Sequence, residues 1–193
     1  INEKFNYIIG NPPWFVIGKN AKDENDAINY SYWNKNRKYF SRERQISQCF
    51  LHRIKYWSDK NTKFGFIVNS SNFINESDNF QRFIFSSYRL ERIFELYHVK
   101  KILFDYAEEP ACLLIFDNLN KQLNSIEYFL PKLNSFAETF KTILLNQCDV
   151  IVVKQQDLLE KKIKLRDYLI GNEQELALAN KLEQECLSIV DII

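Results

Sequence analysis

The sequence is poor in several residue types, and each shortage excludes a kind of site. Its 193 residues include no Met, four Gly, four Pro and four Cys. The cysteines stand far apart without a CxxC pair, and the chain has only two histidines, so we expect no metal site. Reduced, mostly buried cysteines in a cytoplasmic protein are the expected arrangement.

The glycines are as scattered as they are few. Gly10, Gly18, Gly65 and Gly171 form no GxG pattern, so the sequence has no glycine-rich loop for a nucleotide-like cofactor. A run of about 18 apolar residues is also missing, and we expect neither a membrane-spanning helix nor a membrane partner. No signal-peptide pattern opens the chain. Because it starts at Ile1 and lacks Met, we expect it to be a piece of a longer polypeptide.

The charges of the chain nearly cancel. Lys and Arg number 26 and Asp and Glu 25, which leaves a net charge of +1. This balance argues against a strongly basic protein that binds nucleic acid regardless of sequence, but it leaves room for a local basic patch. The apolar share of 46% is ordinary for a globular protein, whereas the aromatic share of 15% is high.

What is present is a series of buried strands separated by helices. Continuous apolar runs predict strands at 5–9, 64–68, 90–96 and 111–116. Apolar residues at spacings of three and four predict helices at 42–59, with Ser41 as N-cap, and at 76–88. This order predicts an α/β fold with a mainly parallel sheet.

The polar stretch from 15 to 40 is expected to be a long loop. Its aromatic side chains could grip unstacked bases, and the cations in and after it are candidate phosphate contacts. The alternative is a solvated loop with partly buried rings. His52 lies off the apolar stripe of its helix and is expected at the surface. The candidate DNA contacts are Lys35, Arg37, Lys38, Arg42 and Arg44.

The pattern changes after about residue 120, where we place a boundary. Strands are expected at 126–130 and 150–153. Ser135 and Glu138 form a capping box that predicts a helix to about 146, and Asn172 with Glu175 repeats that pattern before a final helix. The chain would thus consist of residues 1–120 and a smaller α+β extension, 121–193.

The first strand ends in an unusual tetrapeptide, Asn11-Pro12-Pro13-Trp14. Proline has a carbonyl acceptor but no N–H donor, and it holds the residue before it in extended conformation. The Asn11 amide oxygen and the Pro12 carbonyl can therefore accept both hydrogens of one amine, while Trp14 lies flat on its ring. The alternative is a strand-ending turn without chemistry, since Pro and Asn are common there.

This tetrapeptide after an apolar strand resembles the catalytic motif of amino-group methyltransferases, and most closely that of the adenine-N6 DNA methyltransferases of bacterial restriction–modification systems. The order of the following segments resembles that family too, and the likeness covers residues 1–118 well and the rest loosely. The similar segments are 65–68, the polar turn with Phe at 69–73, 104–107, 111–116 and, as a linker, 165–182.

The resemblance implies a partial Rossmann-like methyltransferase sheet, mainly parallel with an antiparallel last strand. It implies S-adenosylmethionine as methyl donor and double-stranded DNA with a flipped adenine as partner. Asn11, Pro12 and Pro13 would form the catalytic motif, Trp14 would stack on the base, and Phe104 would be a second aromatic of the base pocket. The family's cofactor motif precedes this tetrapeptide, so we expect the fragment to lack it, to depend on the remainder of the parent enzyme, and to be inactive alone.

Two other functions fit the same residues. Similar motifs occur in enzymes that methylate RNA guanine amines or protein glutamine side chains, although the insertion at 15–40 and the long C-terminal part fit the DNA enzymes better. A non-catalytic module, which binds DNA or supports another subunit, is the third possibility.

Overall fold

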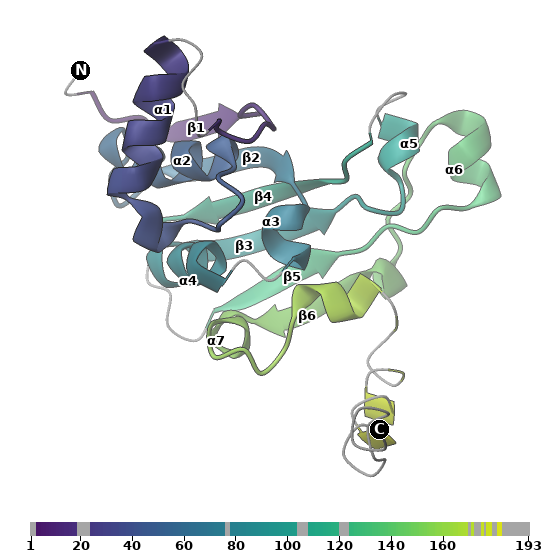
Figure 1. Cartoon of the computed structure of the whole chain (residues 1–193). Coiled ribbons are helices and arrows are strands. Elements are labelled where there is room, and N and C mark those ends of the chain that lie inside the picture. The colour runs from purple at the N-terminus through teal and green to yellow at the C-terminus, as the bar shows by residue number, and fades with distance from the viewer. Residues whose placement is uncertain are drawn as a thin grey trace, which may run out of the picture.

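A computed structural model gives the arrangement of the chain (Figure 1). It describes residues 3–18, 24–75, 78–103, 108–119, 124–169, 171, 175, 177–178 and 181–182. The helix predicted from Asn172 lies largely outside the described residues. None of the described helices is long and apolar enough to cross a membrane.

Six strands form one sheet in the order β1-β2-β4-β3-β5-β6. β1 pairs with β2 and β3 with β5 in parallel, whereas β4 and β6 run antiparallel to their neighbours. Four strands therefore point one way and two the other, which agrees with the predicted mainly parallel sheet. The strands are β1 (Tyr7–Gly10), β2 (Lys63–Asn69), β3 (Arg89–Glu95), β4 (Ala111–Asp117), β5 (Ser125–Phe129) and β6 (Val150–Lys154).

Every predicted strand is present, but the first is not buried. β2, β4 and β3 occupy the centre of the sheet, and the continuous apolar runs of β2 and β4 suit that position. β1 is an edge strand, with Tyr7 70% and Ile9 82% exposed, so the expectation of a buried strand was wrong for this chain. The boundary near residue 120 stays a prediction, and β5 beyond it continues the same sheet.

Helices α1, α2, α3, α4 and α7 gather over one face of the sheet, and α5 and α6 lie beyond its far end (Figure 1). The longer ones are α1 (Glu24–Lys35), α2 (Ile46–Arg53) and α4 (Asp78–Ser87). The short ones are α3 (Ser71–Ile74), α5 (Lys100–Leu103), α6 (Ser135–Phe140) and α7 (Gln155–Leu159), with 3-10 turns η1 (Arg37–Tyr39), η2 (Ile54–Tyr56), η3 (Gln147–Asp149) and η4 (Leu165–Leu169).

Two predictions for residues 15–59, a loop and a helix N-cap, need correction. The stretch predicted as a loop from 15 to 40 contains α1, a helix without an apolar stripe, which is why periodicity did not reveal it. α2 begins at Ile46 after Gln45, and Ser41 does not cap it. The backbone N–H of Ser41 instead donates to Gln48 Oε1 at 2.9 Å, and Gln48 Nε2 donates to Ser41 Oγ at 2.9 Å.

The helix predicted at 135–146 is also shorter than expected. α6 ends at Phe140 because Lys141 takes a left-handed conformation, with φ at 52°. Its N-cap is Asn134, whose side chain accepts the Ala137 N–H at 2.8 Å, rather than Ser135.

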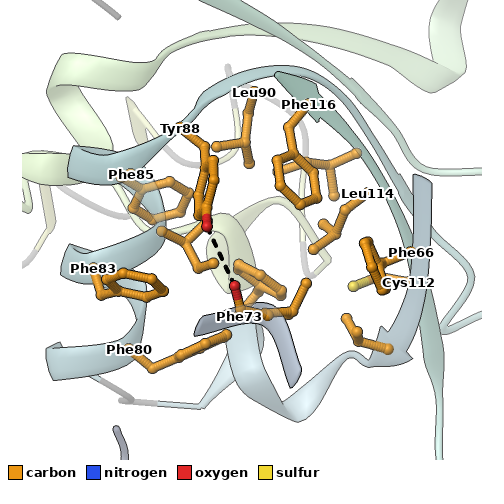
Figure 2. Packing of buried hydrophobic residues seen from close by; sticks show 14 of the residues in the cluster. Phe66, Phe73, Phe80, Phe83, Phe85, Tyr88, Leu90, Cys112, Leu114 and Phe116 are labelled. Carbon is orange, nitrogen blue, oxygen red and sulfur yellow. Dashed lines mark hydrogen bonds between the residues drawn. The ribbon is translucent and has the colours of Figure 1, made fainter. Parts of the chain in front are cut away.

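The core lies between the sheet and α4, and aromatic rings fill most of it (Figure 2). Phe64 and Phe116 from neighbouring strands stack with ring centroids 4.7 Å apart. Tyr88 joins them and donates its hydroxyl to the Leu51 carbonyl at 3.3 Å. The opposite face of β2 and β4, which carries Ile67 and Leu113, is only half-buried in the described residues.

His52 was expected at the surface, but it is 1% exposed. Its Nδ1 lies 2.8 Å from the Tyr32 hydroxyl of α1, and its Nε2 lies 3.1 Å from Lys55 Nζ. The rings of Tyr39, Phe40 and Phe83 surround it at 4.9 to 5.4 Å. Burial, with the nearby Lys55, lowers its pKa to about 4, so it is neutral and ties α1 to α2.

Candidate active site

The candidate site lies at the carboxyl ends of the parallel strands, a common place for ligand sites in open α/β sheets. β1 leads into the tetrapeptide at 11–14, β2 into the turn Asn69-Ser70-Ser71-Asn72, and β3 ends on Glu95. Three segments far apart in the sequence thus lie at the same end of the sheet, and α5 and α6 lie beyond that end in Figure 1.

Gly10 sets the approach of the tetrapeptide to the sheet. It pairs with Phe66 of β2, and a Cβ at Gly10 would stand 3.0 Å from the Phe66 ring. Pro12 is buried next to it, whereas Asn11 is exposed. Because Asn11 is followed by two prolines, its backbone is extended and its amide is carried beyond the strand end.

Trp14, the predicted stacking residue, is half-buried. Its Nε1 is buried and has no hydrogen-bond partner in the part of the chain that the structure describes. Pro13, the other predicted catalytic residue, is exposed.

The residues after Trp14 are held by a short antiparallel ribbon. The Ile46 N–H donates to the Phe15 carbonyl at 3.1 Å, and the Ile17 N–H donates to the Arg44 carbonyl at 2.9 Å. Val16 and Gln45 form the bridge between these two bonds. The ribbon of residues 15–17 and 44–46 fixes the tetrapeptide to the start of α2.

A network of amides connects that ribbon to the turn after β2. Gln45 Nε2 donates to Ser71 Oγ at 3.3 Å, and Gln48 Nε2 donates to Asn72 Oδ1 at 2.8 Å. The turn is closed internally, since Asn69 Oδ1 accepts the Ser71 N–H at 2.8 Å. Because each partner is itself held, the network gives the edge a defined shape.

Glu95, the last residue of β3, borders the candidate site on the side of that strand. It is 1% exposed, and its Oε1 accepts from Ser70 Oγ at 2.6 Å and from the Tyr97 N–H at 3.1 Å. Burial raises its pKa to about 7, although these hydrogen bonds act in the opposite direction. Burial also raises the pKa of the neighbouring Cys112 thiol and of Tyr128, so neither of these two neighbours supplies a charge that balances the carboxyl group.

The other predicted site residues are placed less completely. Phe104 lies outside the described residues, and α5 leads up to it. Four of the five candidate DNA contacts are exposed, and the fifth, Arg44, is half-buried in the ribbon. The exposed four are Lys35, Arg37, Lys38 and Arg42.

Reasoning from the sequence missed the polar side chains that support the site. Gln45, Gln48 and Glu95 lie in predicted helices or strands and carry no local motif, because their partners are distant in the chain. The polar turn 69–72 was noticed only as a strand end. A buried Gln on an apolar helix face, as at Gln48, is the one signal that could have pointed to the network.

The arrangement can bind a planar group that has an amine. The Asn11 amide is exposed at the end of β1, and Pro12 offers a carbonyl acceptor without an N–H donor. The aromatic ring of Trp14 comes two residues after Pro12 in the sequence. A catalytic base is not needed next to these acceptors, because an alkylated amine loses its proton readily. Among the described residues, no group of three or more His, Cys, Asp or Glu side chains could hold a metal ion.

Comparison with known proteins identifies a family and a shared fold. The family model described as the Eco57I restriction-modification methylase matches residues 1–103, which include the tetrapeptide, the turn after β2 and Glu95. No curated protein sequence matches the chain.

Solved structures of low sequence identity share the fold. The type IIG restriction endonuclease BpuSI is 16% identical over 94% of this chain and 23% of its own, with a TM-score of 0.58. A type I restriction-modification methyltransferase subunit from Streptococcus thermophilus is 10% identical over 84% of this chain and 37% of its own, with a TM-score of 0.53. A DrdV–DNA complex is 15% identical over 79% of this chain and 18% of its own, also with a TM-score of 0.53. The chain thus spans less than half of each of these proteins.

Proposed function

The chain belongs to the Eco57I restriction-modification methylase family, and from this premise we propose that it is the target-base part of an adenine-N6 DNA methyltransferase. The observation that carries the proposal is the exposed Asn11 amide at the end of β1, beside the buried Pro12 and followed by Trp14. The ribbon and the amide network hold these residues in place.

The chain's own residues would act on the adenine amine. The Asn11 amide oxygen and the Pro12 carbonyl accept its two N–H groups, which turns the lone pair out of conjugation with the ring. Trp14 stacks on the base, and Phe104 supports the other side of the pocket. Pro13 keeps the backbone stiff, so that the two acceptors keep their spacing.

The methyl donor would be S-adenosylmethionine, which supplies an electrophilic methyl group when bound. The described residues fit the base side of the reaction rather than the cofactor side. None of the described glycines has a positive φ, as the tight turn of a glycine-rich loop requires. We therefore assign cofactor binding to the remainder of the parent enzyme and expect no methyl transfer by the chain alone.

The structure offers two surfaces for that remainder. β1 presents an open edge with Ile9 and Tyr7 exposed, and such an edge is a template for another strand. The half-buried face of β2 and β4, with Ile67 and Leu113, lies next to it. Residues 121–193 would lead toward a target-recognition region, and the enzyme would act on double-stranded DNA with a flipped adenine in the cytoplasm.

Asn11→Ala in the enzyme that contains this chain tests the proposal. We expect kcat to fall about 10²- to 10³-fold, the cost of removing one positioned hydrogen-bonding group, while the Kd for S-adenosylmethionine stays within about twofold. Methyl transfer from the labelled cofactor to DNA measures the first quantity, and calorimetry measures the second.

Asn6→Ala is the matched control, because Asn6 is an exposed asparagine at the opposite end of β1. It should retain activity. Full activity of Asn11→Ala would remove the assigned role, and methylation of RNA or of a protein substrate instead of DNA would replace the proposed substrate.

A further inference from the structure

Arg44 combines two unusual features. Its φ is 55°, a left-handed conformation that costs a side-chain-bearing residue free energy. Its Nη1 is buried and has no hydrogen-bond partner in the described part of the chain. A buried guanidinium nitrogen without an acceptor is rare, and in a native protein it calls for an explanation.

The backbone strain at Arg44 is maintained by its neighbours. Its carbonyl accepts the Ile17 N–H at 2.9 Å, and the next residue, Gln45, forms the bridge to Val16. The strain is therefore part of the ribbon that begins one residue after Trp14. Since strained residues concentrate at functional sites, the position of this one beside the tetrapeptide indicates a role in ligand binding.

Most of the buried side-chain nitrogen and oxygen atoms without partners belong to residues in the ribbon or next to it in the sequence. The described residues contain four, and three of them belong to Trp14, Arg44 and Ser47. All three can donate a hydrogen bond, and none of them is an obligatory acceptor. A ligand group that accepts hydrogen bonds therefore suits this part of the molecule.

The charge of the segment favours a polyanion over a single carboxylate. Between Lys35 and Arg44 the sequence has five cations and one acid, whereas the whole chain has a net charge of only +1. Arg37, Lys38 and Arg42 are exposed. The segment between them is anchored, because Phe40 is buried and the Tyr39 ring packs on Phe83 at 5.4 Å.

We propose that Arg44 binds a DNA backbone phosphate next to the nucleotide whose base the tetrapeptide holds, with Arg37, Lys38 and Arg42 following the same strand outward. The guanidinium fork matches two phosphate oxygens, and the Arg44 side chain is only half-buried, so part of it is open to such a group. This proposal rests on the proposed function, and it assigns to Arg44 the contact closest to the reacting base.

The salt dependence of DNA binding tests it in the enzyme that contains this chain. Each phosphate contact contributes about 0.9 to the slope of log Kobs against log salt concentration on duplex DNA. Arg44→Gln should lower that slope by about this amount and raise the KM for DNA. Arg44→Lys keeps the charge, so it should keep the slope and lose only affinity.

Lys60→Gln is the matched control, because Lys60 is an exposed cation that precedes β2. It therefore lies at the opposite end of the strands from the tetrapeptide. Its slope should equal that of the wild type. If Arg44→Gln does not fold, as thermal unfolding would show, Arg44→Lys alone decides: unchanged DNA affinity at every salt concentration overturns the proposal.

Two results would overturn the assignment while leaving the proposed function intact. One is an unchanged slope for a folded Arg44→Gln enzyme that still methylates DNA. The other is a loss of S-adenosylmethionine affinity with DNA affinity preserved, which would assign Arg44 to the cofactor carboxylate. Absence of DNA binding by the wild type would refute both proposals together.

Discussion

Replacing Glu95 by Gln should stabilise the protein at alkaline pH, because the fold buries a carboxyl group without a cation. Glu95 is 1% exposed and bonded to Ser70 and to the Tyr97 N–H. Its neighbours Cys112 and Tyr128 are themselves kept neutral by burial. Gln keeps the shape and the acceptor oxygen of the protonated side chain, and it cannot ionise.

The sign and size follow from the pKa of Glu95, which burial raises from 4.5 to about 7. A raised carboxyl pKa contributes stability that is fully present below pH 4.5 and is lost as the pH rises to about 7. The whole difference corresponds to about 3 kcal/mol. In a chain of this length that is roughly 6 to 12 °C in Tm.

Thermal and urea unfolding at pH 5 and pH 8 measure the effect. The gain of Glu95→Gln over the wild type should grow by about 2.5 kcal/mol between these two values, because a small part of the difference is already present at pH 5. Glu127→Gln on β5 is the control, because Glu127 is an exposed partner of Arg92 at 2.6 Å and such pairs contribute less than about 1 kcal/mol. Its effect should stay below about 1 kcal/mol at both pH values.

An equal effect of Glu95→Gln at both pH values would refute the reasoning. So would a loss of stability that is largest at pH 8, since this would mean that the ionised carboxylate is the stabilising form. The pH dependence of wild-type stability is not a sufficient test. The lowered pKa of His52 makes stability rise with pH over nearly the same range in which Glu95 makes it fall.

The remaining predictions concern side chains whose partners were not visible in the sequence. Gln155 is 2% exposed and bonds the carbonyls of Phe85 and Tyr88 at 2.7 Å and the Leu90 N–H at 3.0 Å. Gln155→Leu leaves these groups unpaired, so urea unfolding should show a loss of at least about 3 kcal/mol. His52→Gln should reduce the loss of Tm between pH 6.5 and pH 4, because burial lowers the His52 pKa to about 4 and the fold favours its neutral form.

The central strands could be predicted because their apolar runs are continuous. Residues 64–68 and 111–116 were assigned correctly, since a short continuous apolar run predicts a strand without any information on its partners. α1 could not be predicted in this way. Its sequence has no apolar stripe, and its contacts with the rest, such as that of Tyr32 with the distant His52, depend on aromatic side chains that pack against the core.

The site could be predicted only in part. Asn11 to Trp14 stand together in the sequence, so their chemistry was readable before the fold was known. The strain at Arg44 arises from pairing with Ile17, and the buried Glu95 meets Ser70 across β4. Such pairings join residues more than twenty positions apart, and neither sequence periodicity nor a local motif records them.

The central claim is that this chain holds the adenine amine during methyl transfer to DNA. Its most direct test is nucleoside analysis by mass spectrometry after the enzyme that contains the chain has acted on DNA with isotopically labelled S-adenosylmethionine. We expect label in N6-methyladenine, and only background label from the Asn11→Ala enzyme. Label in N4-methylcytosine, in RNA or in protein, or full labelling by the Asn11→Ala enzyme, would contradict it.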